Sequence, residues 1–164
     1  MDNTARFEVL YRQYYTPIYK FCFRFLNNRE GAHDVTQETF IKFFERMNQQ
    51  GNKIENNRAW LYKVAGNLCL NSLNKKTRHS KIENTIEIQS VENANPENIL
   101  IDNEKSKMVR NAIGQLKPKN RALILMYQDG LSYQEMAEAT GIKQSSIGKT
   151  LWRAIDKISA NIKL

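Results

Sequence analysis

Apolar residues recur every three or four positions along most of this 164-residue chain, and this spacing limits its fold more than any other feature. Over residues 4–26 the steps are four, three, four, three and four, through Phe7, Tyr11, Tyr14, Ile18, Phe21 and Phe25. That is the period of one face of an α-helix. Only seven glycines and three prolines interrupt the chain. The sequence therefore predicts an all-α protein.

The same spacing and the turn residues predict six further helices. They are expected at about residues 30–49, 57–77, 100–116, 119–127, 132–140 and 144–162. Ser132, followed three residues later by Glu135, forms a capping box at the start of the short helix. Gly141 then turns the chain into the last helix. A helix, a glycine turn and a second helix of these lengths are typical of a helix-turn-helix.

Positive charge is concentrated at the two ends of the chain. Residues 1–81 hold 14 Lys and Arg against 7 Asp and Glu, and residues 105–164 hold 11 against 4, so each segment has a net charge of +7. Residues 82–104 hold six acids and no base. We expect two small helical domains, 1–80 and 105–164, joined by a flexible acidic linker, 81–104. Two basic domains favour a nucleic acid held at two points, and the equal alternative is surface charge that only keeps the protein soluble.

Several classes of protein are excluded or disfavoured. Cys22 and Cys69 both lie in apolar stretches, which argues against a disulfide scaffold and a Cys-based zinc site. His33 and His79 have no partners at ligand or triad spacing, and no nucleophile has an adjacent base, so we expect no catalytic residue, metal or cofactor. The opening MDNTARFEVL lacks a signal-peptide core, and no apolar run could span a bilayer. We expect a cytoplasmic protein without membrane insertion.

The last expected helix has a polar face suited to duplex DNA. Its apolar stripe consists of Ile147, Leu151, Ile155, Ile158 and Ile162. Ser145, Lys149 and Arg153 lie two positions away from this stripe and therefore point to the other side. Such a helix offers its polar side to the major groove, where Arg153 can bind a guanine edge. Gly148 costs about 1 kcal/mol relative to Ala in a helix, and close approach to DNA is one explanation. The alternative is a terminal amphipathic helix with a solvated outer face.

The third expected helix has a second polar stripe, with apolar residues on its other side. The stripe follows steps of four, four, three and four through Lys63, Asn67, Asn71, Asn74 and Arg78. The side expected to face the core holds Leu61, Val64 and Leu68. Lys75 and Lys76 add charge, and Trp60 and Tyr62 lie at the entry of the stripe. Cations that follow a backbone, amides that read base edges and rings that stack on bases favour an unpaired strand. The alternative is a core Trp60 and surface amides without a ligand.

The second expected helix carries an acidic strip on one side. The strip consists of Asp34, Gln37, Glu38, Ile41 and Glu45, and it points away from Phe40, Phe43 and Met47. Acids are poorly placed to bind DNA and better placed to bind a basic partner protein. A solvated acidic face is the equal alternative.

Three runs in this order and spacing resemble a known family. They are AHDVTQETFIKFFER, NRAWLYKVAGNLCLNSLNKKTR and LKPKNRALILMYQDGLSYQEMAEATGIKQSSIGKTLWRAIDKI. Over about residues 7–78 and 106–160, the chain resembles bacterial sigma factors of the extracytoplasmic-function (ECF) group. The resemblance implies a protein that binds core RNA polymerase and recognises the minus-ten and minus-thirty-five promoter elements. It implies no active site in this chain, because the polymerase supplies the catalysis.

The resemblance also implies roles for particular residues. Those implied to bind the clamp helices of the largest polymerase subunit are Asp34, Gln37, Glu38, Phe40 and Ile41. By this resemblance Lys63, Asn67, Asn71 and Asn74 would face the melted non-template strand of the minus-ten element. From the stripe itself we expect Trp60, Lys75, Lys76 and Arg78 to bind the same element, as duplex and as melted strand. The loop at about residues 50–57 would help to hold a flipped base. Those implied to bind the minus-thirty-five element are Ser145, Ser146, Lys149, Thr150 and Arg153.

The family pattern also suggests further partners, and this chain departs from the pattern in places. The acidic linker matches the segment that threads the RNA exit path, and an anti-sigma protein is a possible partner. Asn71 and Asn74 stand where the family often has Asp and Arg, Gly148 where it often has Lys or Arg, and Lys143 where it often has Ser. We expect these changes to alter promoter specificity. The alternative function is a helix-turn-helix repressor that binds duplex DNA as a dimer without polymerase.

Overall fold

The computed structural model describes residues 2–51, 53–83 and 104–162, with side chains described as far as residue 76 in the second range. The expected linker, 81–104, therefore lies almost wholly outside the described residues. All secondary structure in the described part is helical, which confirms the predicted all-α class. In order, the helices are α1 (Asn3–Leu26), α2 (Arg29–Asn48), α3 (Asn57–Glu83), α5 (Glu104–Gln115), α6 (Pro118–Gln128), α7 (Tyr133–Thr140) and α8 (Gln144–Ile162).

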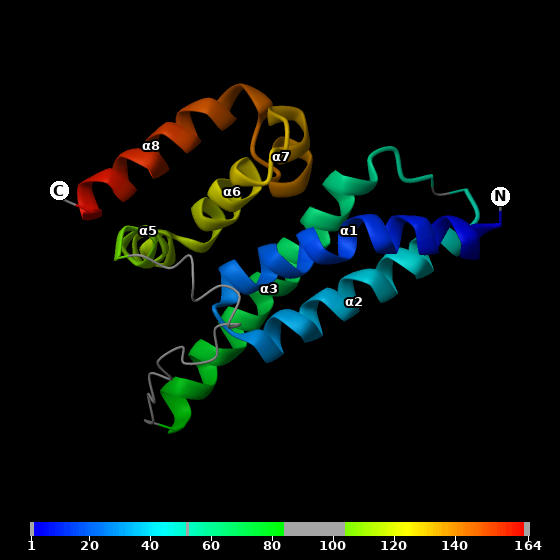
Figure 1. Cartoon of the computed structure of the whole chain (residues 1–164), viewed down its shortest axis with the longest axis horizontal. Helices are drawn as coiled ribbons and strands as arrows, with labels where there is room; N and C mark the ends of the chain where they lie inside the picture. Colours follow the sequence, from blue (N-terminus) through cyan, green and yellow to red (C-terminus); the bar gives the residue numbers. More distant parts are fainter. Residues whose placement is uncertain (1, 52, 84–103, 163–164) are drawn as a thin grey trace.

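The first lobe consists of α1, α2 and α3, which pack against one another (Figure 1). Asn27 ends α1 in the left-handed conformation at φ 52°, and the Asn28 side chain caps α2 by accepting a 3.1 Å hydrogen bond from the Gly31 N–H. These two asparagines make a tight turn, so α1 and α2 lie side by side. The centre of the lobe is fully buried and consists of Ile18, Phe21, Phe25, Phe43, Leu61, Tyr62 and Cys69.

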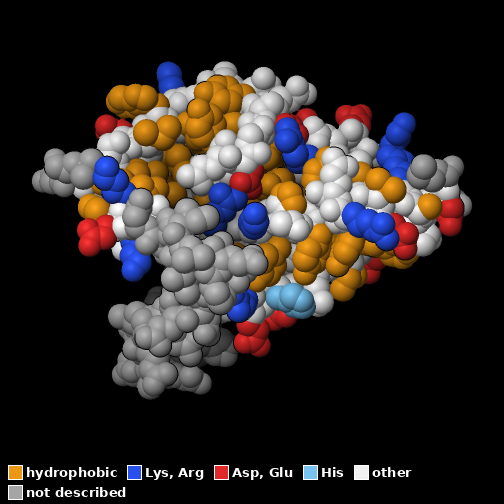
Figure 2. All heavy atoms as spheres, viewed as in Figure 1, with side chains coloured by type: hydrophobic (Ala, Val, Ile, Leu, Met, Phe, Trp, Pro, Cys, Tyr) orange, Lys and Arg blue, Asp and Glu red, His pale blue; other side chains and the backbone are white. Residues whose placement is uncertain are grey.

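Aromatic rings fill much of the contact between α1 and α2. Phe7 lies edge-on to Phe44 with ring centroids 5.1 Å apart, and Tyr11 lies edge-on to Phe40 at 5.0 Å. Figure 2 shows hydrophobic side chains gathered in a band over these two helices. Tyr11 was expected on the buried seam of α1, but it is 38% exposed because it lies at the edge of this contact.

The second lobe consists of α5 to α8 and contains the predicted helix-turn-helix. Ser132 and Glu135 form the expected capping box: the Glu135 N–H donates to the Ser132 hydroxyl at 3.1 Å, and the Ser132 N–H donates to the Glu135 carboxylate at 3.0 Å. Gly141 ends α7 with a positive φ of 76°, a conformation that glycine adopts without strain. The turn then places α8 against α6 and α7 (Figure 1).

The core faces of α8 and α3 differ from the expected stripes. On α8 the buried residues are Ile147, Leu151 and Ala154, whereas Ile155 is 44% exposed. Ala154, the residue before Ile155, faces the rest of the lobe instead. Its small side chain lets α8 lie close to the other helices of the lobe. On α3 the most deeply buried side chains are Leu61, Tyr62, Ala65 and Cys69, while Val64 and Leu68 are only half-buried. The buried face of α3 is rotated from the predicted one, because α3 packs on α1 and α2 of its own lobe and also on α6 and α7.

The two lobes are in contact along α3 and α1. Helix α7 packs on α3, and α6 packs on α1 and α3. The side chain of Met126 in α6 lies close to Gly66 in α3: its Cε would be 3.7 Å from a Cβ placed on that glycine. This contact is not evident in the sequence, where both lobes have the same sign of charge.

Candidate nucleic-acid interface

The polar stripe on α3 is on the surface of the first lobe. Its described members are all exposed: Lys63, Asn67, Asn71 and Asn74, with Lys75 and Lys76 beside them. The side chain of Arg78 lies outside the described residues, although its backbone belongs to α3. Six of the eight expected minus-ten residues are thus exposed along α3.

The two aromatic residues at the entry of this stripe have different environments. Trp60 is half-buried, and its ring centroid lies 5.5 Å from that of Phe43, so one part of the indole packs on the core and another part faces solvent. Tyr62, which we expected near bases, is only 2% exposed. Its ring packs edge-on to Phe21 at 5.1 Å and its hydroxyl donates to Asp129 at 2.7 Å. Tyr62 is therefore a core and interlobe residue, not a stacking platform.

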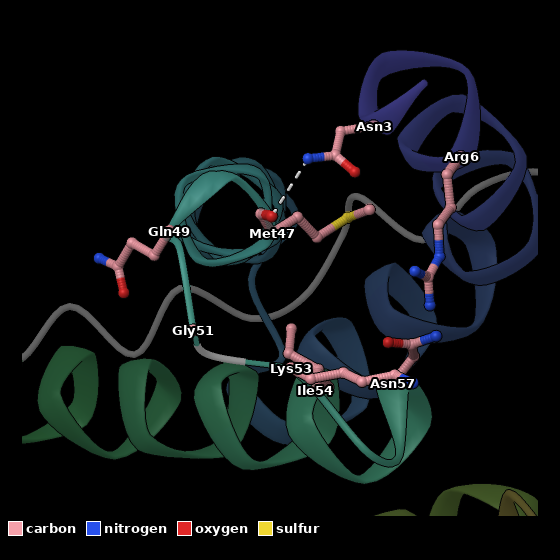
Figure 3. Close-up of a pocket in the computed structure, with 8 residues that line it drawn as sticks. All are labelled: Asn3, Arg6, Met47, Gln49, Gly51, Lys53, Ile54 and Asn57. Atoms are coloured by element: carbon pink, nitrogen blue, oxygen red, sulfur yellow. Dashed lines mark hydrogen bonds between the residues drawn. The ribbon is translucent and has the colours of Figure 1, made fainter. Parts of the chain in front are cut away.

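A cavity of about 320 Å³ lies beside the start of α3 (Figure 3). It is lined by residues from the end of α2, the following loop and the start of α1: Asn3, Arg6, Met47, Gln49, Gly51, Lys53, Ile54 and Asn57. Figure 3 shows the Arg6 side chain reaching from α1 toward Asn57. The side chain of Asn3 donates to the Met47 carbonyl at 3.4 Å and so ties α1 to α2. Two cations and three amides thus surround a space of the size that binds small ligands.

Asn3 and Arg6 were not predicted as site residues. They precede the loop by about fifty positions, and neither belongs to a polar stripe of the kind that identified α3. The antiparallel packing of α1 on α2 brings them to the loop, so only the tertiary structure could identify them.

A second hollow, of about 450 Å³, lies between α2 and α3. Its lining includes Asp34 and Glu38 of α2 and Asn71, Asn74 and Lys75 of α3. The expected polymerase-binding strip and the expected minus-ten stripe therefore border the same groove from opposite sides.

The acidic strip on α2 is exposed. Asp34, Gln37 and Glu38 face solvent, and Ile41 is 59% exposed. Phe40, which the resemblance adds to the polymerase-binding residues, is only 3% exposed and packs against Tyr11, so in this structure it does not lie on the surface that the strip presents. Its sequence neighbours Thr39 and Phe43 are buried on the same face, which explains the difference.

The outer face of α8 presents the expected minus-thirty-five residues. Ser145, Lys149 and Arg153 are exposed, and Ser146 and Thr150 are half-buried. The Thr150 hydroxyl donates to the Ser146 carbonyl at 2.8 Å, so in this state it is occupied by its own helix. Trp152, which was not predicted to take part, is 67% exposed between Lys149 and Arg153 along the helix.

Gly148 packs beside an aromatic ring of the same lobe. A Cβ at Gly148 would lie 3.6 Å from Cε2 of Tyr133, the first residue of α7. The absence of a long side chain at 148 therefore lets the Tyr133 ring lie along α8. A Cβ at this position would make only an ordinary van der Waals contact, so the packing does not require a glycine, and the close approach of DNA that the sequence suggested stays a prediction.

Comparison with known proteins decides the family. The model of sigma-70 region 2 matches residues 10–79, and that of sigma-70 region 4 matches residues 106–158. The ECF RNA polymerase sigma factor SigE of Mycolicibacterium smegmatis is 29% identical over 148 residues, which cover 88% of this chain and 56% of SigE. This chain belongs to the ECF sigma factors. The RNA polymerase sigma factor YlaC of Bacillus subtilis is 28% identical over 166 residues, covering 99% of this chain and 95% of YlaC.

Solved sigma-factor structures share the fold. The sigma factor RpoE of Bartonella quintana, crystallised with the anti-sigma factor NepR, matches with a TM-score of 0.77 at 19% identity, over 97% of this chain and 98% of RpoE. CnrH, solved with the cytosolic domain of CnrY, matches with a TM-score of 0.68 at 18% identity, over 96% of this chain and 87% of CnrH. The region 2 match contains the α3 stripe and the α2 strip, and the region 4 match contains the outer face of α8.

Proposed function

We propose that this chain is a sigma factor that binds core RNA polymerase and directs it to promoters with two separate elements. The observation that carries the proposal is the pair of exposed polar faces, one on α3 and one on α8, in lobes that match regions 2 and 4 in that order. We assign residues 1–80 to the minus-ten element and to polymerase, residues 105–164 to the minus-thirty-five element, and residues 81–104 to the linker.

The α3 stripe would hold the non-template strand of the minus-ten element. Lys63, Lys75 and Lys76 supply charge for the phosphates, while Asn67, Asn71 and Asn74 offer amides to exposed base edges. The exposed part of Trp60 would stack on a base. The cavity beside α3 would receive the flipped base, with Arg6 and Lys53 attracting its phosphate. Melting would be favoured because the stripe and the cavity bind unstacked bases, which duplex DNA does not offer.

The outer face of α8 would lie in the major groove of the minus-thirty-five element. Arg153 has the geometry to donate two hydrogen bonds to a guanine edge, and Lys149 can bind a base or a phosphate. Ser145 and Ser146, near the start of the helix, would donate to phosphates together with the free N–H groups there. Thr150 would have to release the Ser146 carbonyl before its hydroxyl could take part.

The strip of Asp34, Gln37, Glu38 and Ile41 would bind the clamp helices of the largest polymerase subunit. The strip has two acids and an amide around an exposed isoleucine. A partner helix with basic side chains around one apolar residue would complement it. Phe40 would support this surface from below by packing α2 on α1. An anti-sigma protein is the further partner we propose, and RpoE, which shares the fold, was solved with one.

The catalysis would belong to the polymerase. The described residues contain no group of three or more His, Cys, Asp or Glu side chains placed to hold a metal ion. None of the described helices is long and apolar enough to cross a membrane. The proposal gives this chain binding and positioning roles.

Promoter binding with and without core polymerase tests the proposal against the repressor alternative. A labelled promoter fragment should shift in a gel only when this chain and core are both present. Tight, sequence-specific binding by the chain alone, as a dimer, would contradict the proposal.

A further inference from the structure

Trp152 on α8 is the most exposed large apolar side chain among the described residues. Its exposed fraction is 67%, against 59% for Ile41, the next highest. An indole left in water gives up the large free energy that its burial would provide, and Trp is enriched where proteins contact their ligands. The packing of the lobe gives no reason for this exposure, so we looked for a ligand group that the ring could cover.

Trp152 lies on the polar side of α8 and not on its core side. It follows Ser145 by seven residues, which is two turns with an offset of about 20°, and it follows Lys149 with an offset of about 60°. The buried Ile147 lies about 140° away from Trp152 around the helix. The ring therefore shares the side of α8 that carries Ser145 and Lys149, which are both exposed.

Gly148 leaves the space beside this ring free of a long side chain. It precedes Trp152 by one turn, on the same side of α8. Among the described residues, only the Tyr133 side chain comes within 4 Å of a Cβ placed at Gly148, its chain neighbours and its own helix backbone left aside. Tyr133 is itself 46% exposed. Tyr133, Gly148 and Trp152 thus form a partly open apolar surface, here called the aromatic face.

The charges around the aromatic face favour a polyanion as its ligand. Lys149 and Arg153 are exposed next to Trp152, one on each side of it along α8. Asp156 is the only acid of α8, and its charge is balanced by the adjacent Lys157. A positive surface attracts nucleic acid and repels a basic protein. DNA is therefore the partner that the charge selects for this ring.

Duplex DNA offers such a ring one complementary group in the major groove. The faces of the bases are covered by stacking, and only the edges of the base pairs are exposed there. Among the groups on these edges, the apolar one is the C5-methyl of thymine, which apolar side chains contact. A long side chain at position 148 would occupy the space beside the ring through which a methyl group can approach. The glycine keeps this space open.

We propose that Trp152, with Tyr133 and Gly148 beside it, is a specificity-determining residue that reads a thymine methyl group in the minus-thirty-five element. The inference rests on the proposed function and adds a preference that the polar residues of α8 do not provide. Lys149 and Arg153 select through hydrogen bonds, whereas Trp152 selects by taking one methyl group out of water. Cytosine, adenine and guanine carry no such group.

The test replaces thymine by uracil, which pairs in the same way and lacks only the methyl group. A labelled promoter is selected from a random library by the wild-type chain with core polymerase. Each thymine of the minus-thirty-five element, on either strand, is then replaced in turn. Dissociation constants are measured with core and the wild type, Trp152→Ala, Trp152→Phe or Ile155→Ala. Circular dichroism verifies that each variant is folded.

Ile155→Ala is the matched control. Ile155 is another exposed apolar residue of α8, and it lies about 60° further from Lys149 than Trp152 does. It therefore removes apolar surface from the same helix without changing the aromatic face. Trp152→Phe is the conservative variant, because it keeps an apolar ring and removes only the indole N–H.

At one position, the wild type should bind the uracil fragment about fourfold more weakly, as expected for one methyl group buried on binding. Ile155→Ala and Trp152→Phe should retain this effect. Trp152→Ala should bind the thymine and uracil fragments equally, and its affinity for core without DNA should equal that of the wild type.

Equal binding of every uracil fragment by the wild type would overturn the proposal, and so would a selected element without thymine on either strand. A methyl effect that persists in Trp152→Ala would remove Trp152 from the contact. Loss of the effect in Trp152→Phe would assign it to the indole N–H and contradict the apolar contact. Weaker core binding by Trp152→Ala, with no uracil effect, would assign the ring to a protein partner and also overturn the proposal.

The failure of the proposed function has a different signature. In that case the wild type with core would select no promoter at all, and the reading of thymine would fall with it. If only the reading of thymine is wrong, promoters are selected and bound, and the uracil fragments bind as tightly as their thymine parents.

Discussion

Arg58, at the start of α3, and Glu135, in the first turn of α7, form a bidentate ion pair across 77 positions of sequence. Each residue lies in the first turn of its helix. Arg58 directly precedes Ala59, whose N–H is capped by Asn56, and Glu135 completes the capping box of the helix-turn-helix. The pair therefore couples the start of the proposed minus-ten helix to the start of the proposed minus-thirty-five motif.

Glu135 makes the stability of the chain depend on pH at the acid end. Hydrogen bonds from Arg58, chiefly, lower the pKa of Glu135 from its ordinary 4.5 to about 2 in the folded chain. Because the folded pKa is depressed, the stabilisation is complete above about pH 4.5 and is lost as the pH falls toward 2. We expect Glu135→Gln to lower the free energy of unfolding by on the order of 2–3 kcal/mol at neutral pH.

Urea unfolding of the wild type and of Glu135→Gln at several pH values checks this expectation. The difference between the two chains should shrink as the pH is lowered from about 6 to about 3. A difference that stays constant over this range would show that the Glu135 charge does not contribute.

The hydrogen bond from Tyr62 to Asp129 is a second polar contact between the lobes, and its removal should have a smaller effect on stability. Burial, together with the hydrogen bond to Asp129, raises the pKa of Tyr62 well above its usual range, so the hydroxyl stays protonated as a donor. Tyr62→Phe keeps the ring against Phe21 and removes only this hydrogen bond. We expect a loss of about 1 kcal/mol in the free energy of unfolding. Tyr127→Phe is the control, because Tyr127 is 50% exposed. It should change the free energy of unfolding by less than the experimental error of the measurement.

Gly148→Ala separates a packing role of this glycine from a DNA-binding role. The new Cβ would make an ordinary 3.6 Å contact with Tyr133, so the helix propensity of Ala should raise the free energy of unfolding by about 1 kcal/mol. Promoter affinity should be unchanged, as measured by titration of labelled DNA into the polymerase complex. A stable variant with much weaker promoter binding would instead support close approach of DNA at Gly148.

Arg153→Ala tests base reading by α8. If Arg153 binds a guanine edge, its loss should cost about 1–3 kcal/mol at one position of the minus-thirty-five element and relax the base preference there. Both effects are measured by letting promoters altered at each position of the minus-thirty-five element compete with a labelled promoter for the polymerase complex. Lys157→Ala, at an exposed cation one turn further along α8, is the matched control. An equal loss on every sequence would make Arg153 a phosphate contact.

Ile41 tests the proposed polymerase surface. Ile41→Lys places a charge at the centre of the strip and should weaken core binding at least tenfold without changing the stability of the chain. Val9→Lys is a close control, because Val9 is 58% exposed and Ile41 59%. Fluorescence titration with core measures both variants, and equal affinities would remove Ile41 from the interface.

Local features of this fold could be predicted from the sequence, and long-range ones could not. The apolar spacing predicted the helices, and Ser132 with Glu135 predicted the capping box, because both depend on residues within one or two turns. Tyr62 was expected near bases, and the resemblance implied a polymerase contact for Phe40, but the structure buries both side chains, because packing between helices decides which edge of an apolar face is covered. Glu135 was recognised only as a cap, since nothing in its neighbourhood indicates that Arg58 approaches it.

The same distinction applies to the site. The stripe on α3 and the polar face of α8 repeat at helical spacing and could be found by it, and their described members are exposed as expected. Asn3 and Arg6 line the cavity beside α3 only because α1 packs antiparallel on α2. The role of each of these residues in promoter binding stays a prediction.

Run-off transcription tests the central claim most directly. Purified chain, sigma-free bacterial core polymerase and a library of promoter fragments are combined, and transcripts are mapped to their start sites. We predict defined transcripts that require the added chain, from promoters that share two elements upstream of the start. A chain that neither binds core nor yields any transcript would contradict the account.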